Sequence, residues 1–149
     1  MSVTVRPLGD KDFFPWLGLF EGYSTFYESE LTDQKALQVW SWIIDPNNAL
    51  DGAVAVDDDD GSLVGLAHYR TVPRTLDGDL ALFLDDLYVA EDSRGKGIGA
   101  QLMDFTTAYA REHKLAQVQL LTGADNAPAQ VLYNKLGTRT EWVTYEIDA

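Results

Sequence analysis

Hydrophobic and polar positions along this chain follow two different periods, and these periods mark its secondary structure. Apolar residues at every second position indicate strands, and apolar residues at steps of three and four indicate helices. The first pattern and short apolar runs predict strands at residues 3–6, 53–56, 63–69, 80–89, 118–121 and 142–147. Helical spacing predicts helices near residues 13–27, 32–44, 97–113 and 127–136. The order β-α-α-β-β-β-α-β-α-β predicts an α/β fold with a mixed sheet and helices on both faces.

Turn and cap residues separate these elements. The segment Asp57–Gly61 predicts the turn of an antiparallel hairpin, and it lacks the ligand spacing of a calcium loop. Thr32 or Asp33 is expected to cap the second helix, and Asn126 the last one. Two glycines inside the first helix weaken it, so its far end is expected to bend.

Composition limits the architecture and the chemistry. A chain of 149 residues with 46% apolar residues suits one domain, residues 1–149, with one interior. No apolar stretch reaches the length of a membrane span, and the N-terminal residues show no leader pattern. Cysteine is absent and only two histidines are present, so neither disulfides nor a metal site is expected. We therefore expect a cytoplasmic protein with no membrane partner.

The formal net charge of −13 narrows the range of partners. Such a surface repels nucleic acid, so no nucleic-acid partner is expected. It attracts a cationic substrate, although a strongly acidic surface also serves solubility alone. An anionic cofactor would need a local positive site.

A glycine-rich segment supplies that positive site. Residues 94–100, RGKGIGA, follow a predicted strand and open a predicted helix. The glycine spacing matches neither the dinucleotide-binding fingerprint nor a P-loop, and its form is R-x-x-G-x-G. Backbone N–H groups in such a loop, together with the helix N-terminus, favour a pyrophosphate. The alternative interpretation is a surface turn that is merely rich in glycine.

The order of elements and this loop resemble the GNAT superfamily of acyl-CoA-dependent N-acyltransferases. Matching segments are FLDDLYV at 83–89, the loop at 94–100 and LTGADNAPAQVLYNKLG at 121–137. FYESELT at 26–32, LVGLAHYR at 63–70 and WVTYEI at 142–147 are similar to the branch that includes the yeast histone/polyamine acetyltransferases. The resemblance covers nearly the whole chain and implies a GNAT fold with splayed central strands.

The resemblance also implies a site for coenzyme A. The backbone of Leu87 to Val89, with Tyr88 between them, would bind the pantetheine arm, although both apolar side chains also suit core packing. The pyrophosphate would be held by Arg94, Gly95, Lys96, Gly97, Ile98, Gly99 and Ala100. Asn126 would contact the cofactor, serve as a helix cap, or do both.

The implied reaction transfers the acetyl group of acetyl-CoA to an amine. Tyr133 is the candidate general acid for the departing thiolate, and its alternative role is packing on the sheet. Asp85 is the candidate base, directly or through water, and alternation places it on one face with Leu87. Asp86 would take that role if the strand carried a bulge. Substrate attraction or a structural ion pair is the alternative for this acidic pair.

The acceptor is expected to be a small-molecule or peptidyl amine, such as a polyamine or a lysine side chain. Residues that could line its pocket are Phe26, Tyr27, Glu28, Trp40, Tyr69 and Asp86, although most of the aromatic residues would also suit the core. Residues 138–149 leave room for one final strand where many relatives have two, so we expect a homodimer to complete the substrate side. The alternative function is a catalytically silent acyl-CoA sensor. A transferase acting on charged tRNA would need a basic face.

Overall fold

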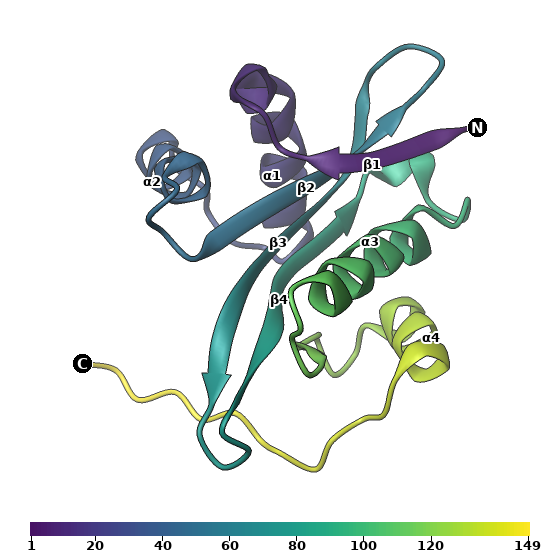
Figure 1. Cartoon of the computed structure of the whole chain (residues 1–149). Coiled ribbons are helices and arrows are strands. Elements are labelled where there is room, and N and C mark those ends of the chain that lie inside the picture. Colours follow the sequence, from purple (N-terminus) through teal and green to yellow (C-terminus); the bar gives the residue numbers. More distant parts are fainter.

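One mixed sheet runs through the molecule in the order β1-β2-β3-β4-β5 in the computed structural model, which describes residues 1–149 (Figure 1). The strands are β1 (Val3–Pro7), β2 (Leu50–Asp57), β3 (Leu63–Arg74), β4 (Asp79–Val89) and β5 (Val118–Leu120). Consecutive strands from β1 to β4 pair antiparallel, and β5 joins β4 in parallel. The predicted hairpin between β2 and β3 is confirmed, and β3 extends five residues beyond its predicted end at Tyr69, to Arg74.

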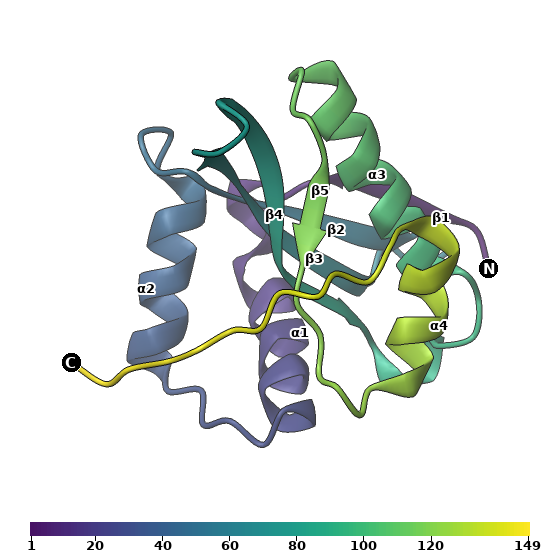
Figure 2. The ribbon, with the colours of Figure 1, turned by 90° about the horizontal axis from the view of Figure 1, so that it is seen from below.

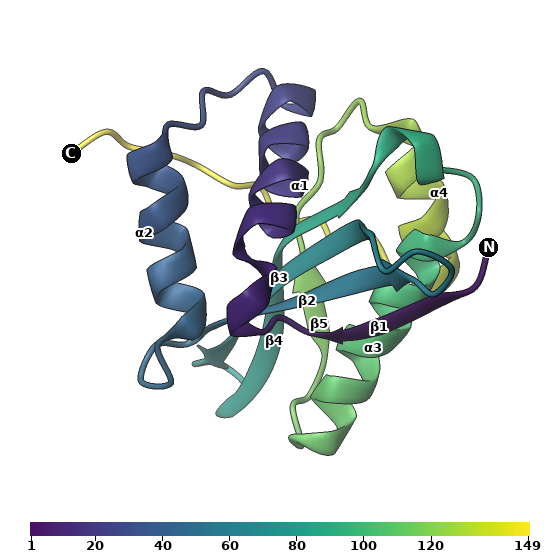
Figure 3. The same cartoon turned by 90° about the horizontal axis from the view of Figure 1, so that it is seen from above.

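Helices cover both faces of this sheet. They are α1 (Phe13–Phe26), α2 (Asp33–Ile44), α3 (Ile98–Glu112) and α4 (Ala127–Leu136), with short 3₁₀ turns η1 (Asp10–Asp12) and η2 (Glu91–Ser93). The pair α1 and α2 lies on one face, and α3 and α4 lie on the other (Figures 2 and 3). None of these helices has the length and apolar content needed to cross a membrane.

The predicted helix caps form. The Thr32 side chain accepts a hydrogen bond from the backbone N–H of Lys35, and Asn126 accepts one from the N–H of Ala129. The first helix runs without interruption, so the expected bend does not occur. Its Gly22 instead lies against the Tyr88 ring, since a Cβ added there would lie 2.6 Å from the Tyr88 hydroxyl. This glycine allows α1 to approach β4 closely.

Two apolar clusters hold the layers together, because alternate strand residues point to opposite faces. On one face, the buried side chains of the sheet pack with those of α3: Ala53, Ala55, Ala67, Leu82, Leu84, Ile98 and Leu102. On the other face, Val54 and Leu66 of the sheet pack with Trp16, Leu19 and Trp40 of the two N-terminal helices. The second cluster fixes α1 against β3, and thereby places the end of α1 beside β4.

The predicted closing strand at Trp142–Ile147 is wrong. Residues after Gly137 contain no helix or strand. The apolar side chains there are exposed, at 85% for Trp142, 79% for Val143, 85% for Tyr145 and 92% for Ile147. The alternation of apolar and polar residues favours a strand in this segment. The edge strand β5, however, has only three residues with which it could pair. The observed order therefore ends at α4.

Candidate active site

The glycine-rich loop between η2 and α3 presents an unbroken row of backbone donors. Gly95 and Gly97 have φ of 75° and 79°, and nothing lies within 4 Å of a Cβ built on either residue. No N–H group from Gly95 through Ala100 donates a hydrogen bond within the protein. Donors gathered in this way at the start of a helix form a site for an anion, and the helix dipole adds to the attraction.

Two cations flank this row. The Arg94 Nε donates a 3.1 Å hydrogen bond to the carbonyl of Val89, and its guanidinium lies 5.3 Å and 5.5 Å from the ring centres of Phe26 and Tyr88. Arg94 is therefore fixed between the end of β4 and the end of α1. Lys96 reaches only the carbonyl of Asp92, at 3.5 Å, so its ammonium group stays accessible to solvent. Phe26, expected at the acceptor pocket, supports Arg94 instead.

Strands β4 and β5 separate beside this loop. They pair only at Leu82–Leu84 and Val118–Leu120, whereas β4 continues to Val89. The N–H of Ala90 bonds the carbonyl of Val64, and hydrogen-bonded pairs alternate along an antiparallel ladder. The backbone groups of Leu87 and Val89 consequently point away from β3, into the gap between the strands. This edge can bind an extended chain as a further strand.

A small cavity of about 40 Å³ lies in that gap. Its lining includes Tyr133, Asp85, Leu87 and Asn126, so the structure brings the candidate acid and candidate base to one place. Burial raises the pKa of Tyr133 to about 12. Asn126 caps α4 and also lines the cavity, so its two expected roles are compatible.

A bulge separates the two neighbouring aspartates. Opposite β3, His68 pairs with Asp86 and the next residue pairs with Leu84, so Asp85 is the extra residue. The Asp85 carboxylate accepts hydrogen bonds of 2.9 Å and 3.1 Å from the Arg70 Nε. The Asp86 carboxylate bonds the His68 Nδ1 at 2.8 Å. The simple alternation expected for this strand therefore stops at Asp85.

A larger cavity of about 650 Å³ lies on the other side, between α1, α2 and β4. Its lining residues are Phe20, Tyr23, Ser24, Tyr27, Ser29, Glu30, Leu31, Gln34, Lys35, Gln38, Val39, Trp42 and Asp86. Tyr23 and Tyr27 line both cavities and form the boundary between them. Two of the residues expected at the acceptor pocket, Tyr27 and Asp86, line this cavity.

The other expected acceptor residues lie elsewhere. Trp40 is buried with its ring centre 5.0 Å from that of Trp16, and it lines neither cavity. Tyr69 is buried in the opposite core. Glu28 has φ of 53° just after α1, is exposed, and lines neither cavity. The sequence favours these residues at the pocket because aromatic rings and a carboxylate suit a cationic amine, but two of them are buried in the core and the third is exposed to solvent.

No sequence pattern marks four of the residues around the site as site residues. Tyr23 and Trp16 belong to the apolar stripe of α1, and Arg70 and His68 lie on β3. Burial and the Asp86 charge raise the pKa of Tyr23 well above its ordinary value, so this phenol stays protonated. The apolar stripe predicts which face of α1 is buried. Which residue of that face reaches Asp86 depends on how α1 packs against β4, which is distant in the sequence.

Comparisons with known proteins identify the family and the fold of the chain. The acetyltransferase (GNAT) family matches residues 16–138. The D-amino-acid N-acetyltransferase HPA3 of Saccharomyces cerevisiae (strain ATCC 204508 / S288c) is 31% identical over 144 residues, covering 97% of this chain and 89% of the yeast protein. The crystal structure of ribosomal-protein-alanine N-acetyltransferase from Brucella melitensis biovar Abortus 2308 has a TM-score of 0.82 at 23% identity and covers both chains fully. A structure of AAC(6')-Iy with a bisubstrate analogue has a TM-score of 0.86 at 18% identity, covering 100% of this chain and 99% of the other.

Proposed function

The chain belongs to the acetyltransferase (GNAT) family and is an acetyl-CoA-dependent N-acetyltransferase, and from this premise we propose that its acceptor is a primary amine bound between α1 and α2. The observation that carries the proposal is the row of free backbone donors at the start of α3, which lies next to the open edge of β4. The cavity beside the open edge of β4 and the larger cavity share the wall formed by Tyr23 and Tyr27.

The residues of the loop fit the diphosphate of acetyl-CoA. Gly95 and Gly97 leave open space above unpaired N–H groups, and Arg94 and Lys96 add positive charge. The backbone N–H groups of Leu87 and Val89 and the Leu87 carbonyl offer donors and an acceptor to an extended arm, since the Val89 carbonyl already accepts from Arg94. When bound, acetyl-CoA supplies an activated acyl group on a thiol leaving group.

The chemistry sets two demands on the protein. An alkyl ammonium has a pKa of about 10.4, so its deprotonation at pH 7 costs about 4–5 kcal/mol, and a base lowers this barrier. Asp85 and Asp86 are the carboxylates beside the two cavities. Tyr133 is the proposed acid, since a phenol with its pKa raised to about 12 is protonated at neutral pH and can protonate a thiolate. This division of roles favours an enzyme over a silent acyl-CoA sensor.

The larger cavity supports a cationic acceptor such as a polyamine or a lysine-like amine. Carboxylates of Asp86 and Glu30 and the rings of Tyr23 and Tyr27 line it, and both kinds of group attract an ammonium ion. One observation favours a second candidate, an amino acid. Lys35 is the only basic residue in the lining, and it could hold an acceptor's carboxylate. The yeast relative carries the name of a D-amino-acid N-acetyltransferase.

A cytoplasmic homodimer is part of the proposal. The exposed tail residues Val143, Tyr145 and Ile147 alternate along the chain and would form one apolar face if the segment became a strand. The β1 edge of a second copy, which is five residues long and paired with β2 on one side only, offers this strand a partner. The absence of cysteine suits a reducing compartment.

The test is thiol release from acetyl-CoA in the presence of spermidine, a lysine-containing peptide, or single D- and L-amino acids. The proposal expects release with at least one amine, and mass spectrometry should find one added acetyl group on it. Lys35→Gln separates the two acceptor classes, because it should raise KM for an amino acid and leave KM for spermidine unchanged. Tight binding of acetyl-CoA without release on any amine would contradict the acceptor proposal.

A further inference from the structure

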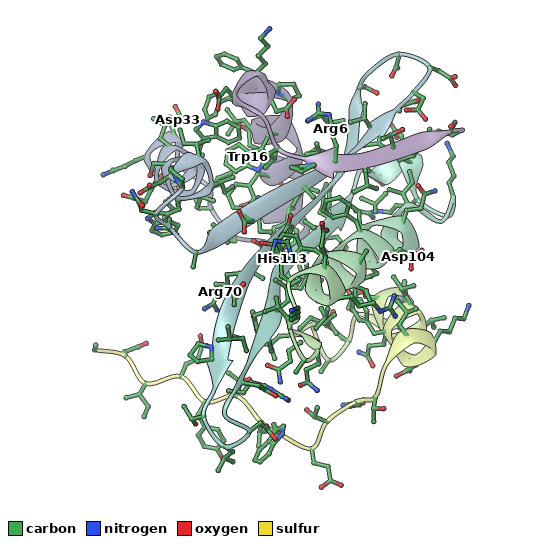
Figure 4. The ribbon with its side chains drawn as sticks, viewed as in Figure 1. Arg6, Trp16, Asp33, Arg70, Asp104 and His113 are labelled. Carbon is green, nitrogen blue, oxygen red and sulfur yellow. The ribbon has the colours of Figure 1, made fainter.

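Two hydrogen bonds in series, one buried and one partly buried, end at the Asp86 carboxylate. The Trp16 Nε1 donates to the His68 Nε2 at 2.9 Å, and the His68 Nδ1 meets the Asp86 Oδ2 at 2.8 Å. The three residues come from α1, β3 and β4, and Figure 4 shows Trp16 between its helix and the sheet. Trp16 is 0% exposed and His68 is 1% exposed, whereas the Asp86 side chain is 23% exposed. The hydrogen-bonded series therefore begins at Trp16 in the buried core and reaches the larger cavity only at Asp86.

The indole fixes the proton arrangement of this hydrogen-bonded series. An indole N–H can only donate, so the His68 Nε2 that faces it must accept and carries no proton. The remaining ring proton then sits on Nδ1 and is donated to the Asp86 carboxylate. His68 is thus neutral, and it orients Asp86 without placing a positive charge next to it.

Asp86 faces the larger cavity with the rest of its surface. The titratable and charged groups around it come from every neighbouring element: Tyr23 and Tyr27 from the end of α1, Glu30 and Lys35 across the cavity, His68 from β3, and Asp85 with its partner Arg70. His68 bonds the Asp86 carboxylate at 2.8 Å, and the Tyr23 phenol also lies close enough to interact with it. Asp85, by contrast, is already neutralised by Arg70. Of the two carboxylates, Asp86 is the one that is not paired with an arginine.

Building on the proposed acetyl transfer, we infer that Asp86 accepts the proton of the acceptor's ammonium group and that His68 and Trp16 are positioning residues that hold it. The freed amine nitrogen forms a bond to the thioester carbonyl carbon, and the carbon–sulfur bond breaks with its electron pair on sulfur. Tyr133 donates its proton to that sulfur, and the nitrogen's second proton restores Tyr133 through solvent. The net change is one amide, one thiol and one released proton.

The proton that Asp86 accepts leaves through the larger cavity and not through His68. The His68 Nδ1 already carries a proton, and its Nε2 lone pair is engaged by Trp16. The hydrogen-bonded series therefore cannot carry the proton into the core, and Asp86 returns it to water in the cavity. This distinguishes a positioning role for His68 from a proton-carrying role.

Substitutions at position 68 test this distinction. His68→Asn keeps an N–H donor near the position of Nδ1 and cannot become charged, whereas His68→Phe keeps the ring and removes the donor. We expect His68→Phe to lower kcat about tenfold to a hundredfold with the KM for acetyl-CoA unchanged, and His68→Asn to keep most of the activity. Equal losses in both variants would overturn the positioning role.

Trp16→Phe gives a second, independent readout. Removal of the indole N–H frees the His68 Nε2 to take a proton as the pH falls, and a cationic His68 would then pair with Asp86. We expect Trp16→Phe to add an ionisation to the acid limb of the kcat profile, and the double variant with His68→Asn to lack it. An unchanged profile in folded Trp16→Phe, verified by circular dichroism, would contradict the inference.

Asp86→Asn compared with Asp85→Asn separates this inference from the proposed function. A loss of kcat of about a hundredfold or more is expected for Asp86→Asn. A larger loss for Asp85→Asn would assign the base to the other carboxylate and overturn the inference. Asp104→Asn, on the exposed side of α3, is the control for a lost surface charge. If the parent enzyme acetylates no amine, the proposed function is wrong, whereas the comparison of the two variants tests the further inference alone.

Discussion

The Arg94 side chain is hydrogen-bonded to the backbone carbonyl of Val89, with 3.1 Å between Nε and the oxygen. This contact ties the glycine-rich loop to the free edge of β4, the two features assigned to different parts of acetyl-CoA. A single arginine therefore lies where the diphosphate site and the strand-like arm site meet. The arrangement makes the affinity for acetyl-CoA sensitive to this residue.

Arg94→Ala should weaken acetyl-CoA binding by about 1–3 kcal/mol, because it removes a charge-assisted hydrogen bond and one of the two cations of the loop. Isothermal titration calorimetry measures the change. Arg111→Ala, on the exposed end of α3, is the matched control and should leave the dissociation constant unchanged. Equal affinity of Arg94→Ala and the parent would remove Arg94 from the site.

Gly97→Ala tests the backbone of the loop. The φ of 79° at Gly97 disfavours any residue with a Cβ, although the Cβ itself would have open space. We expect a loss of about 1 kcal/mol in unfolding free energy and weaker binding of acetyl-CoA. Gly61→Ala is a matched control, since its φ is 76° and its surroundings are equally open, but it lies in the hairpin turn. Both variants should lose stability, and only Gly97→Ala should lose affinity.

Tyr133→Phe should lower kcat by about a hundredfold without changing the shape of the pH profile. The raised pKa of Tyr133, about 12, means that the phenol remains protonated throughout the working range, so no basic limb arises from it. The KM for acetyl-CoA should change little. Tyr109→Phe, which removes a hydroxyl bonded to Asp51 away from both cavities, serves as the control. A kcat equal to that of the parent would exclude Tyr133 as the acid.

The pair between Arg6 and Asp12 should make stability depend on pH. Bonds of 2.7 Å and 2.9 Å from Arg6, and one of 2.7 Å from the Gly9 N–H, hold the pKa of Asp12 below its ordinary value. A depressed pKa stabilises the fold above the ordinary carboxyl value, and this contribution disappears as the pH falls through the folded-state pKa. Asp12→Asn should therefore lose about 1 kcal/mol at pH 7 in urea unfolding, and this loss should shrink as the pH falls below the ordinary carboxyl value. Asp10→Asn, exposed in the same turn, should show no such difference.

The exposed tail predicts the oligomeric state. Replacement of Val143, Tyr145 and Ile147 by Glu should convert the proposed dimer to a monomer, because three charges would then line the face that meets the partner. Light scattering coupled to gel filtration measures this. Glu146→Gln, on the other face of the segment, is the control. A parent chain that is monomeric at high concentration would contradict the dimer.

Local patterns were sufficient for most of the fold. Thr32 and Asn126 specify helix starts because the capping bond is made within a few residues. The loop at 94–100 predicts a row of unpaired backbone donors because they belong to one continuous stretch of backbone. The strand predicted at 142–147 does not form. Alternation shows only that a segment is suited to be a strand, whereas the presence of a free strand edge to pair with depends on the rest of the fold.

The sequence by itself determined the elements up to α4, the glycine-rich loop and the family, since all three depend on residues close together along the chain. Only the tertiary structure decided that a bulge at Asp85 turns Asp86 toward the larger cavity, and that Trp16 and His68 stand behind it. Trp16 and His68 are 52 positions apart, and His68 and Asp86 are 18 apart. Contacts over such separations arise from the packing of α1 on the sheet, which no local periodicity encodes.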